Sequence, residues 1–320
     1  MQDVLLAGCK INLFLRITGV REDGMHELET LFLPLPEPHD VLYVCEREAE
    51  GLAQGTQGQK ESTVTVRCRP LEVGQTCPKM DPVNNTLTRA CALYAEAASF
   101  APALDIEIAK GIPAGAGLGG GSADAAILLR WLNKHAQHPL DEEGLLAVGA
   151  KVGADVPFFL QDSPCLAGGI GEKLGPVSMP ERLCRPGSTL LLICPVEFVS
   201  TPWAYAAWDR WNAQKNLTKR GLGVKDFSSF CPGSHDFSGI ENSFEAPVFQ
   251  AFPRLRRLKE ILLQHGAAAA AMSGSGSSLF GIFDSREAAD AAAKSLRRAG
   301  EIVYVHGLSD SCGNPSHAGV

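Results

Sequence analysis

Residues 115–126 read "GAGLGGGSADAA", and this stretch decides the fold. Five glycines fall within seven residues; the strand-like "LDIEIA" at 104–109 precedes them, and the largely apolar helix former "ADAAILLRWLNK" at 123–134 follows. This order places backbone N–H groups at the N-terminus of a helix that we expect to begin near Ser122. Glycine allows close approach of an anion and positive φ angles, so the stretch predicts a phosphate site.

The glycines alone leave several kinds of loop open. A flexible linker or a tight glycine corner is the simplest alternative. The segment 115–120 also fits G-x-G-x-x-G, with Asp141 downstream, so a dinucleotide site must be considered. In that site the acidic residue ends a second strand, whereas Asp141 begins a predicted helix. No lysine follows the glycines as in a P-loop, and the protein-kinase signatures H-R-D and D-F-G are absent.

Composition excludes several classes of protein. The chain has 320 residues, 45% hydrophobic and 20% charged, which predicts one large or two ordinary compact domains. The net charge is −7 with no Lys/Arg stripe, so we expect no nucleic-acid partner. Lys10 and Asn12 interrupt the first apolar run, so we expect neither signal peptide nor membrane span, and a cytoplasmic location. Ten scattered cysteines lack metal-ligand spacing, so we predict no structural zinc.

Alternating strands and helices predict an α+β protein with two lobes. We expect strands at 11–17, 28–35, 40–46, 63–68, 104–109, 189–196 and 301–305. We expect helices at 86–99, from about Ser122 to 134, from Asp141 to Gly153, and at 203–213, 254–266 and 285–300. The Gly- and Pro-rich stretch 163–188 marks a boundary or hinge, and 46–62 and 217–240 read as irregular loops.

Five ordered motifs carry a family resemblance. They are "CKINLFLRITGVREDGMHELETLF" (9–32), "IPAGAGLGGGSADAA" (112–126), "VGADVPFFL" (152–160), "GIGEKL" (169–174) and "MSGSGSSLFGIF" (272–283). Together they resemble the GHMP kinase superfamily over nearly the whole chain. The resemblance implies a ribosomal S5 domain 2-like N-terminal domain at 1–165, a ferredoxin-like C-terminal domain at 166–308 and a disordered tail at 309–320. It also implies a strand at 267–272, where alanine propensity alone predicts a helix.

The first motif is similar to one branch of this superfamily. The resemblance implies transfer of the γ-phosphate of ATP to the 2-hydroxyl of 4-diphosphocytidyl-2-C-methyl-D-erythritol, in the non-mevalonate isoprenoid route. The expected partner is therefore a small molecule with a cytidine diphosphate moiety. Mg²⁺ is expected with ATP, although no carboxylate constellation in the sequence fixes a metal site. The sequence makes no prediction of oligomeric state.

The resemblance assigns the catalytic residues. Asp155 is implied as the base that takes the proton of the substrate hydroxyl, with helix capping as its alternative role. Lys10 is implied to pair with it and steady the phosphoryl group; its alternative role is an edge lysine whose ammonium reaches water.

The resemblance also assigns binding residues. It places the triphosphate against Pro113, Ala114, Gly115, Ala116, Gly117, Leu118, Gly119, Gly120, Gly121, Ser122 and Ala123, adenine against Asn85, Thr86 and Leu87, and Lys110 near the nucleotide. It places the acceptor against Asn12, Met25, His26, Gly153, Thr201 and Pro202. Met25 stands where an aromatic residue is usual, and Trp203 or Tyr205 is the candidate to supply that surface.

Other functions remain open from the sequence. Another kinase of the superfamily, acting on homoserine, mevalonate or galactose, is the nearest alternative. A Rossmann-type oxidoreductase is a second, through its G-x-G-x-x-G match. A catalytically silent nucleotide-binding regulator is a third, which the presence of Lys10 and Asp155 disfavours.

Overall fold

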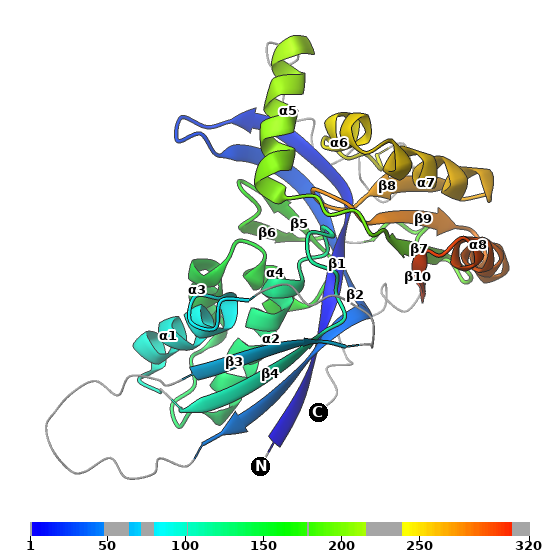
Figure 1. The fold of residues 1–320 in the computed structure, drawn as a ribbon. Helices are drawn as coiled ribbons and strands as arrows, with labels where there is room; N and C mark the ends of the chain where they lie inside the picture. The colour runs from blue at the N-terminus through cyan, green and yellow to red at the C-terminus, as the bar shows by residue number, and fades with distance from the viewer. Residues whose placement is uncertain are drawn as a thin grey trace, which may run out of the picture. The chain divides into compact units, whose positions relative to one another are not determined.

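The computed structural model describes residues 2–47, 64–71, 80–100, 102–177, 179–215 and 239–308 (Figure 1). The loops predicted at 46–62 and 217–240 fall outside these ranges except at their edges, and the tail at 309–320 falls wholly outside them. Two compact units emerge. The first joins Met1–Cys9, Pro36–Pro113 and Gly119–Asp162, and the second joins Lys10–Leu35, Ala114–Leu118 and Ser163–Val320. Because both units are discontinuous in sequence, the domain boundaries at 165 and 308 stay a prediction.

Strands β1 (Gln2–Val20) and β2 (His26–Glu46) contribute residues to both units. The first unit adds β3 (Val64–Pro70), α1 (Thr86–Ala98), β4 (Leu104–Lys110), α2 (Gly120–His135), α3 (Glu142–Val152) and α4 (Val156–Gln161). Here β4 pairs antiparallel with residues 41–46 of β2 and parallel with β3. The four helices pack on one another beside β3 and β4 (Figure 1).

Helix capping explains two of the predicted helices. Asn85 accepts from the N–H groups of Leu87 and Thr88 and forms a capping box at the start of α1. Asp141 caps α3, which carries Glu142 and Glu143 in its first turn and ends at Gly153.

Helix α2 begins earlier than predicted. Its N-cap is Gly119, which has a φ of 74°, and its first residue is Gly120. The start predicted near Ser122 was therefore two residues late. A glycine in the left-handed region turns the chain into the helix directly, without a side-chain cap.

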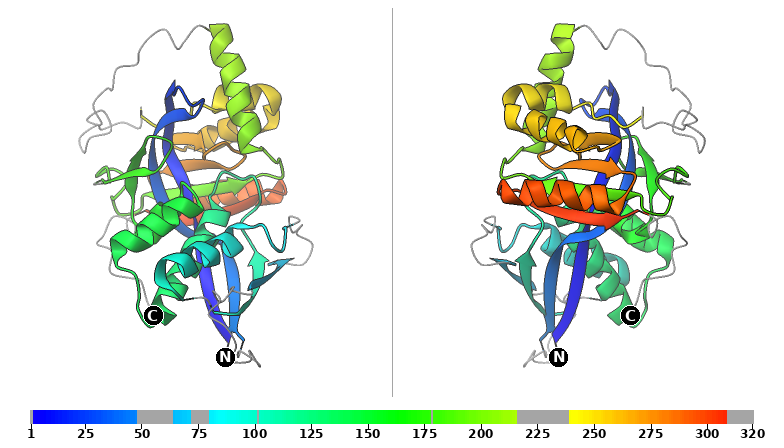
Figure 2. Two further views of the ribbon diagram at one scale, coloured as in Figure 1. Left: turned by 90° about the vertical axis from the view of Figure 1, so that its left-hand side faces the viewer. Right: turned by 90° about the vertical axis from the view of Figure 1, so that its right-hand side faces the viewer.

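The second unit adds β5 (Cys165–Gly168), β6 (Lys173–Pro176), β7 (Thr189–Cys194), α5 (Thr201–Lys215), α6 (Glu245–Ala251), α7 (Pro253–Gln264), β8 (Ala269–Met272), β9 (Leu279–Phe283), α8 (Arg286–Arg298) and β10 (Ile302–Gly307). Its antiparallel sheet has the order β10-β7-β9-β8. Numbered along the chain this order is 4-1-3-2, with helical crossovers after the first and third strands, which confirms the ferredoxin-like expectation. Helices α7 and α8 lie side by side on one face of this sheet (Figure 2).

Several short elements were not predicted. The strands expected at 28–35 and 40–46 are the single strand β2, whose prolines fall between the residues paired with β5 and those paired with β4. The registers with β4 and β5 therefore require no hydrogen bond from these prolines. Strands β5 and β6, only four residues each, pair within the stretch assigned to a boundary or hinge. The strand implied at 267–272 is confirmed as β8.

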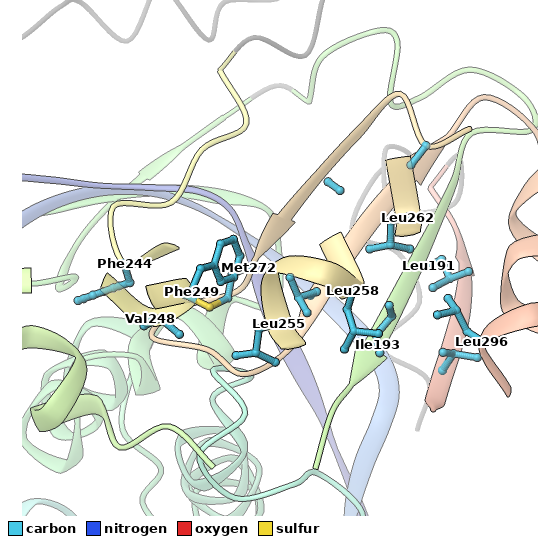
Figure 3. Packing of buried hydrophobic residues seen from close by; sticks show 14 of the residues in the cluster. Leu191, Ile193, Phe244, Val248, Phe249, Leu255, Leu258, Leu262, Met272 and Leu296 are labelled. Atoms are coloured by element: carbon cyan, nitrogen blue, oxygen red, sulfur yellow. The ribbon is translucent and has the colours of Figure 1, made fainter. Parts of the chain in front are cut away.

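The core of the second unit lies between its helices and this sheet (Figure 3). Leu191 and Ile193 of β7 meet Leu258 and Leu262 of α7, and Leu296 of α8 closes the cluster. The two sides of α7 differ in exposure: Leu262, which faces the sheet, is 0% exposed, whereas its neighbour Leu263 is 44% exposed.

We predict that Leu262→Ala lowers the free energy of unfolding by about 2–5 kcal/mol, because it leaves a cavity against β7 and β9. Leu263→Ala is the matched control on the same helix and should change stability by about 0.5 kcal/mol or less. Urea unfolding followed by circular dichroism measures both. Equal losses for the two variants would contradict the packing described for α7.

Candidate functional site

Lys10 is buried in β1, and its ammonium is bonded within the second unit. The side-chain Nζ donates to Asn12 Oδ1 at 2.7 Å and to the carbonyl oxygen of Gly117 at 3.2 Å. It also lies 5.2 Å from the centre of the Phe32 ring, a cation–π distance. Because Lys10 is only 5% exposed, it is not an edge lysine with its ammonium in water.

Asn12 continues this arrangement on the same face of β1. Its side-chain amide donates to Thr30 Oγ1 at 2.7 Å, and its backbone N–H donates to Ser273 Oγ at 3.2 Å. Lys10, Asn12 and Thr30 thus form a chain of buried hydrogen bonds. The acceptor oxygen of Asn12 faces the ammonium, which fixes the direction of its amide.

The two glycine-rich motifs lie against each other in the second unit. Gly115 and Ala116 accept backbone bonds from Ser277 and Ser278 at 3.2 and 3.1 Å, and Ser273 Oγ donates to the Gly117 carbonyl at 3.0 Å. Gly117 has a φ of 74°, and a β-carbon there would lie 2.1 Å from the Ser273 carbonyl oxygen. Both facts require glycine. A loop held in this way is not a flexible linker.

Asn242, which the sequence analysis did not single out, supports the second glycine turn. Its amide donates to the carbonyls of Met272 at 2.6 Å and Gly274 at 2.8 Å, while its Oδ1 accepts from Phe244 N–H. No local sequence pattern marks it, since its partners lie 30 and 32 residues away.

The rest of the predicted phosphate loop belongs to the first unit. There Ser122 and Ala123 donate their backbone N–H groups to the Gly119 carbonyl, each at 3.0 Å. By helix geometry the N–H groups of Gly120 and Gly121 have no carbonyl partner within α2. They are the natural donors to an anion at this helix end.

A surface cavity of about 780 Å³ adjoins the start of α1. It is lined by Val64, Val83, Asn84, Asn85, Thr86, Thr88, Arg89, Ala92 and Val152. Two of the three residues predicted for adenine, Asn85 and Thr86, therefore line one cavity. Leu87, the third, is fully buried and does not line it.

Lys110 lies between two buried carboxylates of the first unit. Its Nζ bonds to Asp40 and, at 2.9 Å, to Asp124 Oδ2. Burial alone would lower the pKa of Lys110, but the carboxylates of Asp124 and Asp40 outweigh it and raise the pKa. Burial raises the pKa of Asp124 to about 7, with Lys110 opposing and Asp40 adding to the shift. The predicted nucleotide neighbour is thus neutralised from within the protein.

Asp155 stands directly before α4, a helix that was not predicted. It occupies the N-cap position, yet its side chain makes no cap hydrogen bond, so helix capping does not account for it. Val156, Phe158 and Phe159 follow it as buried apolar residues. Because Asp155 and Lys10 belong to different units, their pairing stays a prediction.

Gly153 and Ser122 lie close together in the first unit, since a β-carbon on Gly153 would be 3.9 Å from Ser122 Oγ. Gly153, at the end of α3, therefore lies beside the start of α2.

His26 packs against α5 in the second unit. Its Nε2 lies 2.7 Å from Asp209 Oδ1, and its ring centre lies 4.6 Å from that of Tyr205 and 5.5 Å from that of Trp208. These three partners share one face of α5 by their helical spacing. Sequence reasoning named Tyr205 but not Trp208 or Asp209.

The other residues assigned to the acceptor differ in their surroundings. Met25 is 48% exposed, and Thr201 Oγ1 lies 2.9 Å from Ser275 Oγ, so Thr201 touches the second glycine turn. Trp203, the other aromatic candidate, packs on Phe252 with ring centres 5.5 Å apart.

The described residues also bear on metal binding, membrane spanning and thiol reactivity. No group of three or more His, Cys, Asp or Glu side chains in that part of the chain could hold a metal ion. None of the helices that the structure describes is long and apolar enough to cross a bilayer. Burial raises the pKa of the Cys91 and Cys194 thiols to about 12, so neither is a nucleophilic thiolate near neutral pH.

Comparison with known proteins identifies the family of the chain. Residues 85–163 match the GHMP kinases N terminal domain, and residues 214–302 match the GHMP kinases C terminal domain. A 4-diphosphocytidyl-2-C-methyl-D-erythritol kinase from Nitratidesulfovibrio vulgaris is 48% identical over 94% of this chain and 97% of its own length. One from Lawsonia intracellularis is 42% identical over 87% of this chain and 88% of its own. A solved 4-(cytidine 5'-diphospho)-2C-methyl-D-erythritol kinase superposes with a TM-score of 0.70 at 31% identity, covering 95% of this chain and 98% of that one.

The raised pKa of Asp124 predicts a pH-dependent stability. Between the unfolded pKa near 4 and the folded pKa of about 7, the folded state holds a proton that the unfolded state has lost, so stability falls as pH rises through this window. Asp124→Asn cannot titrate. We expect the stability of the natural protein relative to this variant to fall by about 2–3 kcal/mol between pH 5 and pH 8.

Denaturant unfolding of both proteins across this pH range measures the difference. Parallel stability curves for the two proteins would show that Asp124 does not titrate in this window.

Proposed function

The chain belongs to the 4-diphosphocytidyl-2-C-methyl-D-erythritol kinase family of GHMP kinases, and we propose that it transfers the γ-phosphate of ATP to the 2-hydroxyl of 4-diphosphocytidyl-2-C-methyl-D-erythritol. The reaction belongs to the non-mevalonate isoprenoid route. The observation that carries the proposal is the Lys10 ammonium, which bonds to Asn12 and to the Gly117 carbonyl of the glycine loop. One buried cation thereby touches a predicted acceptor residue and a predicted phosphate-loop residue.

ATP is the donor in this proposal. Its triphosphate binds the glycine loop from Pro113 to Ala123, where bare backbone and the N-terminus of α2 supply N–H donors. Its adenine occupies the cavity lined by Asn85 and Thr86, with Leu87 behind it. Lys110 stays a neighbour of the nucleotide rather than a charge partner, because Asp40 and Asp124 already neutralise it.

The cytidine end of the acceptor lies at His26. If Nε2–H is donated to Asp209, the ring leaves Nδ1 as an acceptor, which matches the exocyclic amino group of cytosine. Met25 and the ring of Tyr205 supply apolar surface for the base. Thr201 and Pro202, at the start of α5, and Gly153 complete the contacts that we propose for this substrate.

The chemistry needs positioning, charge neutralisation and one proton acceptor. Asp155 takes the proton of the substrate 2-hydroxyl while the hydroxyl oxygen forms a bond to the γ-phosphorus. The bond from that phosphorus to the β–γ bridging oxygen breaks, and ADP leaves. Lys10 neutralises charge on the transferred group, and Asn12 holds the sugar-alcohol part of the acceptor. Mg²⁺ bound with the triphosphate would offset its charge, and the Ser122 hydroxyl would be one protein oxygen to hold it, since this cation keeps mostly phosphate and water ligands.

We also propose a cytoplasmic location, where ATP is supplied.

A panel of acceptors tests the substrate. Purified protein with ATP and Mg²⁺ is given the cytidine compound, homoserine, mevalonate or galactose, and ADP release is measured. We expect kcat/KM for the cytidine compound to exceed each of the others by at least a hundredfold. Preferential turnover of an acceptor without cytidine would remove the substrate assignment, and NAD(P) binding without ATP binding would favour the oxidoreductase alternative.

Two substitutions test the proposed chemistry. Asp155→Asn removes the base and should lower kcat by about 10²–10⁴-fold with little change in KM for ATP. Lys10→Met should also lower kcat, because it removes the charge but keeps the length of the side chain. Asp162→Asn, at the opposite end of α4, is the control. The Asp162 side chain is exposed, and its backbone is in the left-handed region, which asparagine tolerates. Near-normal kcat in Asp155→Asn would reject the assigned base.

A further inference from the structure

Asp40 is a fully buried carboxylate in β2 that none of the assignments above includes in the site. Its Oδ1 accepts two backbone bonds, from Gly111 N–H at 2.7 Å and from Ile112 N–H at 2.9 Å. Its Oδ2 accepts the ammonium of Lys110. Both carboxylate oxygens therefore bond to three consecutive residues, the last residue of β4 and the two that lead from it toward the glycine loop.

The same cluster reaches the other end of that loop. Lys110 bonds onward to Asp124 Oδ2 in the second turn of α2. A β-carbon added to Gly120 at the start of α2 would lie 3.3 Å from Asp40 Oδ2, so the helix end passes close to the carboxylate. All of these residues belong to the first unit. The last residues before the loop thus bond directly to Asp40, and Asp124, the first residue after it, is joined to Asp40 through Lys110.

The packing around this fastening leaves little room for adjustment. A β-carbon on Gly111 would lie 2.3 Å from the carbonyl oxygen of His39, the residue before Asp40. Of the common side chains, a carboxylate alone can accept two N–H bonds on one oxygen and pair an ammonium on the other. An amide in its place would turn a donor toward Lys110.

We infer that Asp40 is a positioning residue that sets the separation of the two ends of the phosphate loop, and thereby the fit of the loop to the triphosphate of ATP. This inference rests on the proposed function. Asp40 acts through Gly111, Ile112 and Lys110 and touches neither ATP nor the acceptor. Its loss should therefore weaken the use of ATP and spare the use of the acceptor.

The test is Asp40→Asn, which keeps one oxygen for the two N–H groups but places an amide against Lys110. We expect KM for ATP to rise at least fivefold and kcat to fall, while KM for the cytidine acceptor stays within twofold. A purely structural role would lower the active fraction and leave both KM values unchanged. Asp105→Asn is the matched control, because Asp105 lies on the same strand β4 that ends at Lys110 and pairs with Arg47 at the surface. It should behave like the natural protein.

A second measurement keeps the inference falsifiable if Asp40→Asn does not fold. Amide hydrogen exchange of the natural protein should show slow exchange at Gly111 and Ile112, and exchange as fast as in an exposed loop would overturn the inference. An unchanged KM for ATP in a folded Asp40→Asn variant would overturn it equally.

Failure of the proposed function would look different. If the natural protein turned over no acceptor in the panel, the substrate assignment would fall. Binding of a non-hydrolysable ATP analogue by the natural protein and by Asp40→Asn would still decide the role of Asp40, with at least fivefold weaker binding by the variant expected and equal binding overturning it.

Discussion

The backbone at Gly117 passes so close to the second glycine turn that a β-carbon there would lie 2.1 Å from the Ser273 carbonyl oxygen. Much of the polar chemistry of the second unit depends on this approach. Ser273 Oγ donates to the Gly117 carbonyl and accepts from the Asn12 backbone, while Lys10 donates to the same carbonyl. Widening the contact by the size of a methyl group would separate all three groups. The glycine therefore serves the ammonium of Lys10 as much as it serves the loop.

Burial of polar groups without their partners costs several kcal/mol, so each buried charge needs an explanation. In the second unit the Lys10 ammonium is met by an amide oxygen and a carbonyl. In the first unit Lys110 is met by two carboxylates, which together leave one negative charge in excess when both are ionised. The raised pKa of Asp124 relieves that excess by protonation. Asp40 has a hydrogen-bond partner on each oxygen, Lys110 on Oδ2 and the Gly111 N–H on Oδ1.

The sequence predicted a helix well where the residues that start and stop it lie within or next to that helix. Apolar residues at helical spacing placed α1 to within a residue or two, and the acidic first turn after Asp141 with the stop at Gly153 did the same for α3. Where the decisive partner is distant, prediction failed. The prolines of β2 suggested a break, but they fall between two ladders that need no bond from them. Asp40 and Asn242 carry no local sequence pattern, because their hydrogen-bond partners lie 70–72 and 30–32 residues away.

The assigned site shows the same division. The glycine loop, Lys10 and Asn12 could be named from the sequence, because glycines at a helix start and a lysine within an apolar strand are unusual in themselves. His26 could be named only through the family resemblance. Its partners Trp208 and Asp209 could not be named, because only the fold of the second unit brings His26 of β2 against α5.

Met25 gains its meaning from that helix. An aromatic ring at position 25 would stack on a base from one side, whereas here the ring beside His26 is Tyr205, 4.6 Å away. Trp203 instead packs on Phe252 against the hydrophobic core of the second unit. Under the proposed function, the aromatic surface that meets a base at His26 comes from α5, and the exposed Met25 adds an unbranched thioether that adapts to a flat ring without fixing its orientation. In our proposal the orientation of the cytosine is therefore set by the hydrogen-bonding edge of His26, which Asp209 fixes, and not by stacking at residue 25.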